Sequence, residues 1–399
     1  MQPTLAPLKL KKREDRRLRA GHLWIFSNEV DIQATPLVDL APGQDVEIHS
    51  ADGTPIATAY VNPGSLICAR VISRDLKYRL DRSLIKHRLN IALSLRERLF
   101  AQPFYRLCFG ESDGLPGLVV DRYGDVLVVQ INTAGMEQHR DDLIDALNSV
   151  IKPAVIVFKN DGSMRKLEGL ETYVETVVGD ERPSVEISEN GVRFMVPILD
   201  GQKTGWFYDQ YDNRTNLWRY VSGARVLDVF SYIGAWGVQA AVAGASEVMC
   251  VDASAVALDR VHENAQLNAV DERVSTLQGD AFEALSELRA SREQFDVVIV
   301  DPPAFIKRRK DKKKGLQAYS RINQLAIRLL SRDGLLVSAS CSSHLSRDDL
   351  GGLLHQSARH IDRDLTILQQ GHQAADHPIH PAIPETEYLK SYLCRVLPR

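Results

Sequence analysis

Cysteine is scarce in this 399-residue sequence, and its five cysteines lie far apart. The closest two, Cys68 and Cys108, are 40 positions apart, which excludes a CxxC zinc or redox motif and gives no sign of a disulfide framework. No stretch approaches the ~18 apolar residues that a membrane-spanning helix needs. The first residues become basic without an apolar stretch, so we expect no signal peptide. These absences predict a cytoplasmic protein with reduced thiols.

A strong net charge is also absent, because the formal net charge is −3. Hydrophobic residues make up 44% and charged residues 25%, an ordinary globular composition that excludes a long disordered chain, a collagen or a coiled coil. Charge is nevertheless uneven: residues 9–19 hold seven bases and two acids, and residues 307–314 hold seven bases and one acid. One such run is commonly a solvated loop, but two favour a polyanionic partner.

The pattern of strands and helices predicts three domains, consistent with the length. Residues 1–75 indicate a small β-rich domain with a hairpin at Asp52-Gly53. Residues 76–185 begin with a linker helix and continue in the order strand, strand, helix, strand, strand. Residues 186–399 open with a hairpin at Asn190-Gly191, and apolar strands then alternate with helices. That alternation predicts an α/β domain with a parallel sheet covered on both faces.

The first strand of the α/β domain ends at Asp228 and leads into a turn that contains Phe230, Tyr232 and Gly234. In such sheets the ligand lies at the carboxyl ends of the strands. The turn is not the G-x-G-x-x-G motif that a dinucleotide pyrophosphate requires, which disfavours a dinucleotide oxidoreductase. An acid at this place suits a cationic amine and sulfonium better than a phosphate.

Three further acids follow the next three strands. Asp252 suits a ribose diol, Asp280-Ala281 an adenine amine, and Asp301 stands before two prolines. An aspartate after a strand is often only a helix N-cap. Four such acids in register nevertheless predict a binding site for S-adenosyl-L-methionine (SAM).

At this point the chain resembles, almost end to end, a known family: the SAM-dependent 5-methylcytosine methyltransferases of large-subunit ribosomal RNA, methyltransferase I type. The matching segments are 111–125 and 165–171 for the middle domain, 201–214 before the methyltransferase fold, and 376–396 for a C-terminal strand pair. The resemblance implies an N-terminal PUA domain, a small α+β middle domain and a Rossmann-like class I methyltransferase domain. It implies SAM as cofactor and 23S rRNA or a large-subunit precursor as partner, with no membrane, and it leaves a homodimer open.

The resemblance also implies which residues wall the cofactor pocket from the N-terminal side. These are Lys203, Phe207, Asp209, Gln210 and Arg214. Structural alternatives stay open for two of them, because Phe207 could belong to a core and Arg214 could serve as a cap or pair with Asp209.

Methylating carbon 5 of cytosine calls for covalent catalysis, in which a thiolate adds to carbon 6. Cys341 is the candidate nucleophile, since it follows a strand at its carboxyl end among serines. The alternative is a small buried hydrophobic residue, the interpretation we give Cys250. Asp301 is placed to bind the edge of the base. Pro302 stands where some RNA cytosine methyltransferases carry a second cysteine, so the resemblance implies a one-cysteine mechanism.

The two basic runs supply the candidate RNA contacts, and we expect residues 307–314 to form a loop at the mouth of the active site. The candidates are Lys11, Lys12, Arg13, Lys203, Lys307, Arg308, Lys312, Lys313 and Lys314.

Two rival functions stay open. One is SAM-dependent methylation of a base nitrogen such as guanine N7, which needs no cysteine nucleophile. The other is a non-catalytic RNA-binding module, which the four acids disfavour. A metal site at His372, His377 and His380 is disfavoured, because no further ligand lies at suitable spacing.

Overall fold

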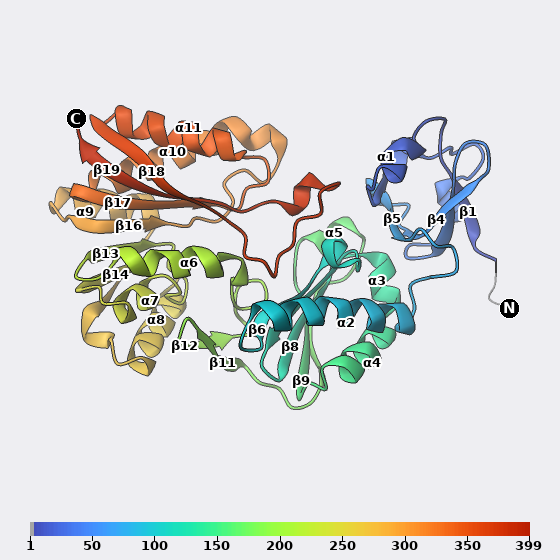
Figure 1. Cartoon of the computed structure of the whole chain (residues 1–399), viewed down its shortest axis with the longest axis horizontal. Coiled ribbons are helices and arrows are strands. Elements are labelled where there is room, and N and C mark those ends of the chain that lie inside the picture. Colours follow the sequence, from blue (N-terminus) through green and yellow to red (C-terminus); the bar gives the residue numbers. More distant parts are fainter. Residues whose placement is uncertain (1–3) are drawn as a thin grey trace. The chain divides into compact units, whose positions relative to one another are not determined.

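The computed structural model describes residues 4–399, which form two compact units (Figure 1). The first unit contains the chain up to Val185 together with Pro197–Tyr208 and Ala375–Thr386. The second unit contains Glu186–Val196, Asp209–Ala374 and Glu387–Arg399. The domain boundaries expected after residues 75 and 185 stay predictions.

The N-terminal part of the first unit is a five-stranded sheet in the order β1-β3-β4-β5-β2. The expected hairpin at Asp52-Gly53 joins β3 to β4, and Gly53 has the positive φ of 88° that this turn needs. The strands are β1 (Ala6–Lys9), β2 (Trp24–Phe26), β3 (Asp45–His49), β4 (Pro55–Val61) and β5 (Ile67–Ser73). The helices are α1 (Asp15–Arg19) and the 3-10 turns Ser27–Glu29 and Leu37–Asp39.

The rest of the first unit is built on a second five-stranded sheet, in the order β10-β9-β8-β7-β6. The strands are β6 (Phe104–Phe109), β7 (Leu118–Tyr123), β8 (Val126–Ile131), β9 (Val155–Asn160) and β10 (Tyr173–Val178). The helices are α2 (Arg82–Leu99), α3 (Ala134–Gln138), α4 (Arg140–Val150), α5 (Met164–Leu167) and the 3-10 turn Gly110–Asp113. The sequence did not predict β6, because Arg106 interrupts its apolar pattern; that side chain is paired with the buried Asp121.

A hairpin and a seven-stranded sheet follow. The hairpin turns at Asn190 and Gly191, both with positive φ, as expected. The sheet order is β15-β14-β13-β16-β17-β19-β18; the first five strands are parallel, and β19 runs antiparallel to both neighbours. The strands are β11 (Ser184–Glu189), β12 (Val192–Pro197), β13 (Arg225–Val229), β14 (Glu247–Asp252), β15 (Val274–Gln278), β16 (Phe295–Val300), β17 (Leu330–Ser340), β18 (Arg363–His372) and β19 (Lys390–Pro398).

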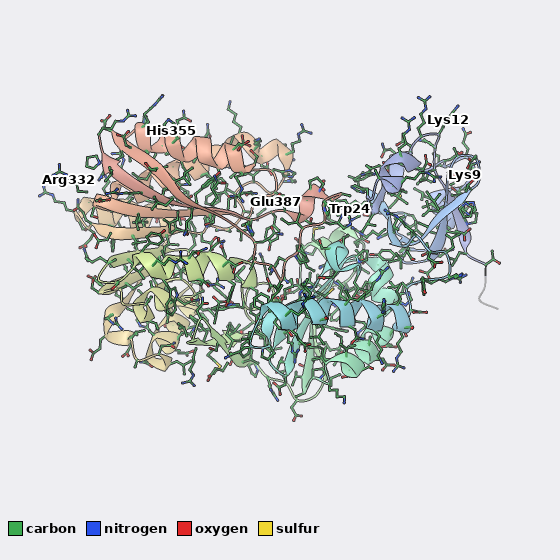
Figure 2. All side chains as sticks on the ribbon, viewed as in Figure 1. Lys9, Lys12, Trp24, Arg332, His355 and Glu387 are labelled. Atoms are coloured by element: carbon green, nitrogen blue, oxygen red, sulfur yellow. The ribbon has the colours of Figure 1, made fainter. Side chains whose placement is uncertain are left out.

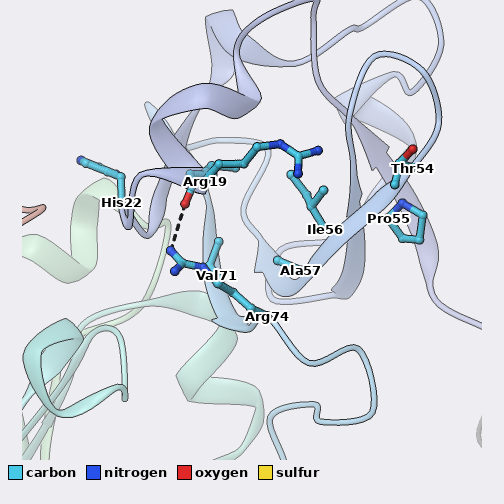
Figure 3. Close-up of a pocket in the computed structure, with 9 residues that line it drawn as sticks. Arg19, His22, Thr54, Pro55, Ile56, Ala57, Val71 and Arg74 are labelled. Atoms are coloured by element: carbon cyan, nitrogen blue, oxygen red, sulfur yellow. Dashed lines mark hydrogen bonds between the residues drawn. The ribbon is translucent and has the colours of Figure 1, made fainter.

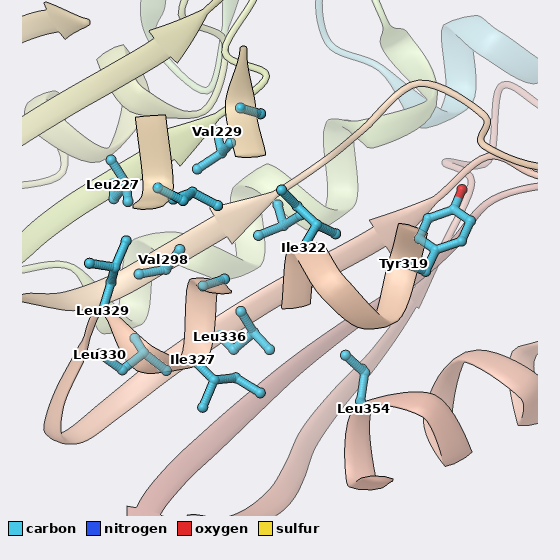
Figure 4. Close-up of a cluster of buried hydrophobic side chains, with 14 of the residues drawn as sticks. Leu227, Val229, Val298, Tyr319, Ile322, Ile327, Leu329, Leu330, Leu336 and Leu354 are labelled. Carbon is cyan, nitrogen blue, oxygen red and sulfur yellow. The ribbon is translucent and has the colours of Figure 1, made fainter. Parts of the chain in front are cut away.

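Helices cover both faces of this sheet, as predicted: Figure 1 shows α10 and α11 on one side and α6, α7 and α8 on the other. Figure 4 shows the core on the first side, where Leu227, Val298 and Leu336 from the strands meet Ile322 of α10 and Leu354 of α11. Each fully buried side chain of this kind contributes about 1.5–3 kcal/mol. The helices are α6 (Tyr211–Leu217), α7 (Gly237–Val242), α8 (Ala255–Leu267), α9 (Ala281–Ala290), α10 (Lys312–Arg328) and α11 (Arg347–Arg359). The 3-10 turns are Tyr208–Gln210, Trp218–Tyr220, Asp271–Arg273, Arg309–Asp311 and Pro384–Thr386.

Two predictions about the last third of the chain were wrong in detail. Residues 307–314 are not a loop throughout, because α10 begins at Lys312. The segment 376–396 is not a strand pair, since only its end from Lys390 lies in β19 and the partner strand is β18. Ala375–Thr386 instead belongs to the first unit, where Asp376 accepts a hydrogen bond from the backbone of Arg106 at 2.8 Å.

No helix within residues 4–399 has both the length and the hydrophobicity that crossing a membrane demands.

Candidate active site

The carboxyl ends of five parallel strands bring the predicted acids and Cys341 to one edge of the sheet. Asp228 lies near the end of β13, Asp252 ends β14, and Asp280 follows β15 by two residues. Asp301 follows β16 directly, and Cys341 follows β17 directly. Because parallel strands end on the same side, this edge is the candidate ligand site.

The turn after β13 has an unusual backbone. Phe230 and Tyr232 have φ values of 67° and 50°, although neither is glycine, and Gly234 has a φ of 86°. The amides of Phe230 and Ser231 both donate to the carbonyl of Val251 on the adjacent strand, at 2.9 and 3.0 Å. Left-handed non-glycine residues cost about 1–3 kcal/mol each and cluster at ligand sites. The strained turn is therefore a candidate ligand-binding element.

Asp252 fixes that turn. Its Oδ2 accepts a hydrogen bond from the Tyr232 amide at 2.9 Å, and its Oδ1 accepts one from the Ser254 amide, also at 2.9 Å. The side chain is only partly buried, and a carboxylate offers about four acceptor positions. It therefore retains acceptor capacity for hydroxyl groups of a ligand.

Asp228 is fully buried. Its Oδ2 accepts from the Gly237 amide at 2.9 Å, whereas its Oδ1 has no hydrogen-bond partner among the described residues. The pKa of this carboxyl group is raised to about 7, mainly by burial and also by the charges of Asp301 and Asp252, although the hydrogen bond from the Gly237 amide lowers it. A nearby cation would offset this cost and favour the ionised form. This orphaned buried oxygen fits a cationic ligand such as SAM.

Asp280 is the N-cap of α9. Its Oδ1 accepts from the amides of Phe282 and Glu283 at 2.9 and 3.3 Å. The helix-cap alternative is thus confirmed for this residue. Its side chain is exposed, so capping leaves room for a ligand contact, and the following Ala281 is buried.

Asp301 is held by two side chains that come from the N-terminal side of its own unit. Gln210 Nε2 and Trp236 Nε1 donate to its Oδ2 at 2.9 and 3.1 Å. Gln210 accepts in turn from Asn213 at 2.7 Å. Trp236 is buried and also orients Asp301, a role that the sequence did not suggest.

Asp209 and Arg214 each have a side-chain partner elsewhere in the second unit. Asp209 Oδ2 accepts from the Tyr388 hydroxyl at 2.6 Å. Arg214 makes two hydrogen bonds to the buried Glu189, at 2.5 and 2.8 Å, and Gln239 supports that carboxylate at 2.7 Å. Arg214 thus braces the hairpin before the sheet through Glu189, and its part in the cofactor pocket stays a prediction.

Lys203 and Phe207 lie in the segment Pro197–Tyr208 of the first unit. The ammonium of Lys203 lies 4.8 Å from the ring centroid of Phe207, a cation–π contact. Their part in the cofactor pocket stays a prediction.

Cys341 is the most accessible of the five thiols, all of which lie in the described residues. It is partly exposed, whereas the other four cysteines are buried. Burial raises the pKa of each of those four thiols. The pKa of Cys250 lies well above that of an ordinary thiol. The buried four are Cys68, Cys108, Cys250 and Cys394.

Buried hydroxyl groups fix the loop on both sides of Cys341. Ser340 Oγ donates to the Tyr319 hydroxyl at 2.7 Å, and Tyr319 in turn lies 2.9 Å from Ser342 Oγ. The amide of Ile306 donates to the same serine hydroxyl at 3.2 Å. These hydrogen bonds tie the turn that carries the thiol to α10 and to the segment after Asp301.

Comparison with known proteins settles the family. Residues 160–393 match the family described as S-adenosylmethionine-dependent methyltransferase, and residues 8–74 match the PUA-like domain. The chain is 38% identical over 393 residues to "Ribosomal RNA large subunit methyltransferase I" of Erwinia tasmaniensis, covering 97% of this chain and 98% of that protein. A protein of the same name from Shigella dysenteriae is 36% identical and is covered over 98% of both chains. This chain belongs to the ribosomal RNA large subunit methyltransferase I family.

The expected fold class and cofactor are thereby confirmed: a PUA-like domain precedes a class I methyltransferase fold, and the cofactor is SAM. The crystal structure of SMU.776 complexed with SAH has a TM-score of 0.84 to this chain at 21% identity, covering 98% of this chain and all of that one, which shows a shared fold.

Most residues of the two basic runs are exposed, but some are already engaged. Figure 2 shows Lys12 projecting from the first unit, and Lys11 and Arg13 beside it are exposed as well. In the second run, Lys312 pairs with Asp349 at 2.7 Å, whereas Lys313 and Lys314 are exposed. Lys307 is also exposed, and Arg308 lies 3.3 Å from Asp311.

The first unit contains a separate hollow of about 410 Å³ between α1 and the β4 and β5 strands (Figure 3). Arg74 crosses one side of it and donates to the carbonyl of Leu18 at 2.9 Å. None of the predicted cofactor or RNA residues lines this hollow.

No group of three or more metal-ligating side chains is found in the part of the chain that the structure describes. His377 lies 2.7 Å from Asp376 in the first unit and is buried.

The sequence interpretation missed Lys390, which lies opposite Ser340 at the start of β19. Period-two alternation places Lys390, Tyr392 and Cys394 on one face of that strand. A lysine on a face that is otherwise apolar or aromatic was the available signal.

Proposed function

We propose that this protein methylates carbon 5 of a cytosine in 23S rRNA, with Cys341 as the covalent nucleophile. The observation that carries the proposal is a partly exposed thiol at the sheet edge that also carries Asp228, Asp252 and Asp301. The names of the relatives support ribosomal RNA as the substrate.

Carbon 5 of cytosine is a poor nucleophile, and addition of a thiolate to carbon 6 makes it more nucleophilic. Cys341 Sγ donates an electron pair to carbon 6; the C5=C6 pair moves to C4–C5, and the C4=N3 pair moves to N3, which gains a proton held by Asp301. When carbon 5 takes up the methyl group, the C4–C5 pair forms the new bond, the C4=N3 bond re-forms and N3 returns its proton to Asp301. A water molecule then accepts the carbon 5 proton, the C5–H pair re-forms the C5=C6 bond, and Sγ leaves as the thiolate. Bound SAM supplies the electrophilic methyl group.

The residues that would hold the cofactor in the second unit are those of the strand-end turns. Asp228 would face its cationic part, Asp252 its ribose hydroxyls and Asp280 its adenine. Gln210 and Trp236 would orient Asp301 toward the base, since both donate to its Oδ2.

Exposed cations would hold the RNA phosphates while the target base leaves its stack. Lys313 and Lys314 start the helix that follows Asp301 and its two prolines, so they are tethered close to the reacting base.

Mass mapping of modified nucleotides in rRNA from cells that lack the protein tests this proposal. One 23S cytosine should lose its carbon 5 methyl group. A wild-type copy and Ser343→Ala, a change at an exposed neighbour of the thiol, should restore it, and Cys341→Ser should not. Loss of a methyl group from a base nitrogen, or rescue by Cys341→Ser, would contradict the proposal and favour the base-nitrogen reaction.

A further inference from the structure

Lys390 lies on the strand beside Cys341. In the antiparallel pair of β17 and β19, Lys390 is opposite Ser340, the residue immediately before Cys341. Neighbouring strands in a sheet are about 4.8 Å apart, so the lysine flanks the turn that carries the thiol.

The buried Lys390 ammonium is hydrogen-bonded to this turn. Its Nζ donates to the carbonyl of Ser342 at 2.7 Å and to the carbonyl of Tyr388 at 2.8 Å, and the residue is only 4% exposed. Its backbone faces the residue before Cys341 and its side chain binds the residue after it. Burying an ammonium costs several kcal/mol unless an opposite charge compensates it.

The charged groups around this ammonium indicate which of them compensates its charge. The pKa of Lys390 is lowered to about 8, mainly by burial, and the Cys341 thiolate is the largest influence in the opposite direction. Arg347 also contributes to the lowering, whereas Glu387 opposes it. An interaction that favours the ammonium when the thiolate is present must favour the thiolate when the ammonium is present.

We propose that Lys390 keeps Cys341 in its reactive thiolate form, both by its charge and by fixing the turn through Ser342. Lys390 is a positioning residue, and this inference rests on the function proposed above. The thiolate is the form that adds to carbon 6 and the form that leaves at the end, so its stabilisation serves both steps. Burial and the Cys341 thiolate both raise the pKa of the Tyr319 hydroxyl, which therefore stays neutral.

The rate of Cys341 alkylation by iodoacetamide, followed by mass spectrometry of its peptide between pH 5.5 and 10, tests this inference. The other four thiols are buried and serve as internal references. In the wild-type protein Cys341 should titrate at least about one unit below the ordinary thiol pKa of ~8.5. Lys390→Met should raise the pKa of the Cys341 thiol by about one unit or more, which slows alkylation at pH 7 about tenfold. Lys390→Arg should bring this pKa most of the way back to the wild-type value.

The matched control is Lys159→Met. Lys159 is a buried lysine of the first unit whose ammonium also binds a backbone carbonyl, that of Leu199. This variant should leave the Cys341 titration unchanged. SAM affinity measured by calorimetry reports whether each variant is folded.

An unchanged thiol pKa in a Lys390→Met protein that still binds SAM would overturn the inference and leave Lys390 as a structural anchor only. If Lys390→Met does not fold, a wild-type thiol pKa at or above ~8.5 overturns it. Alkylation requires no RNA, so this result is separate from the proposed cytosine chemistry. If the thiol pKa is lowered but Cys341→Ser still methylates fully, the proposed function is rejected and the Lys390–Cys341 coupling is kept.

Discussion

At the residue scale, the site contains acidic side chains, and burial changes the ionisation of one of them. Asp228 is the clearest case, because one oxygen secures Gly237 and the other has no hydrogen-bond partner within the described residues. A carboxyl group with a pKa of about 7 is half protonated at neutral pH. A cationic ligand would stabilise its ionised form.

This predicts a pH dependence of cofactor binding. The folded-state pKa of Asp228 is raised, so below pH 7 the residue is neutral and a proton must leave before a cation binds. The dissociation constant for SAM should fall about tenfold per pH unit as pH rises toward 7, and should level off above pH 8. Calorimetry in buffers of different ionisation enthalpy should count the released proton. Asp228→Asn should bind SAM more weakly and without this slope; a flat profile in the wild-type protein would contradict the assignment.

The sequence predicted the acids at the strand ends, because their positions follow from strand periodicity alone. It did not predict what each oxygen binds. Asp252 holds the Tyr232 amide only because Tyr232 has left-handed backbone geometry, and no local pattern announces that geometry. Lys390 was missed for a related reason, since its partner Ser342 is 48 residues away in sequence.

At the element scale, the start of α10 is unusual. Lys312, Lys313 and Lys314 occupy the first turn, where the helix dipole disfavours cations, and Asp311 makes no side-chain cap. The sequence predicted a loop here because these residues lack the usual signals for a helix start. Lys312 is neutralised by Asp349, but the other two lysines face solvent.

Removing the two exposed lysines should weaken RNA binding. The double variant Lys313→Ala, Lys314→Ala should lower the slope of log K against log salt by up to about 0.7–0.9 per lost phosphate contact. Lys312→Ala is the control on the same turn, and it should change the slope less because its ammonium is already paired. Filter-binding titrations from 50 to 300 mM salt give both slopes, with SAM affinity unchanged. Equal slopes in the wild-type protein and the double variant would show that the turn makes no phosphate contact.

At the scale of the whole molecule, the chain crosses between its two units several times. The sequence indicated the alternating strands and helices of the second unit, and both predicted hairpins are confirmed. It could not indicate that Ala375–Thr386 joins the first unit, because that placement depends on contacts such as Arg106 to Asp376, 270 residues apart. Apolar periodicity reports which face of an element is buried, but not which distant segment buries it.

The central claim is that Cys341 bonds to carbon 6 of a cytosine, and trapping that bond tests it most directly. Fluorine at carbon 5 cannot leave as a proton, so 23S rRNA fragments that carry 5-fluorocytosine should stall after methyl transfer. With SAM present, we expect a protein–RNA adduct that survives denaturing electrophoresis and maps to the Cys341 peptide. Cys341→Ser should form no adduct but should still bind SAM, because a hydroxyl is a far poorer nucleophile than a thiolate. An active enzyme that forms no adduct, or an adduct on another residue, would contradict the claim.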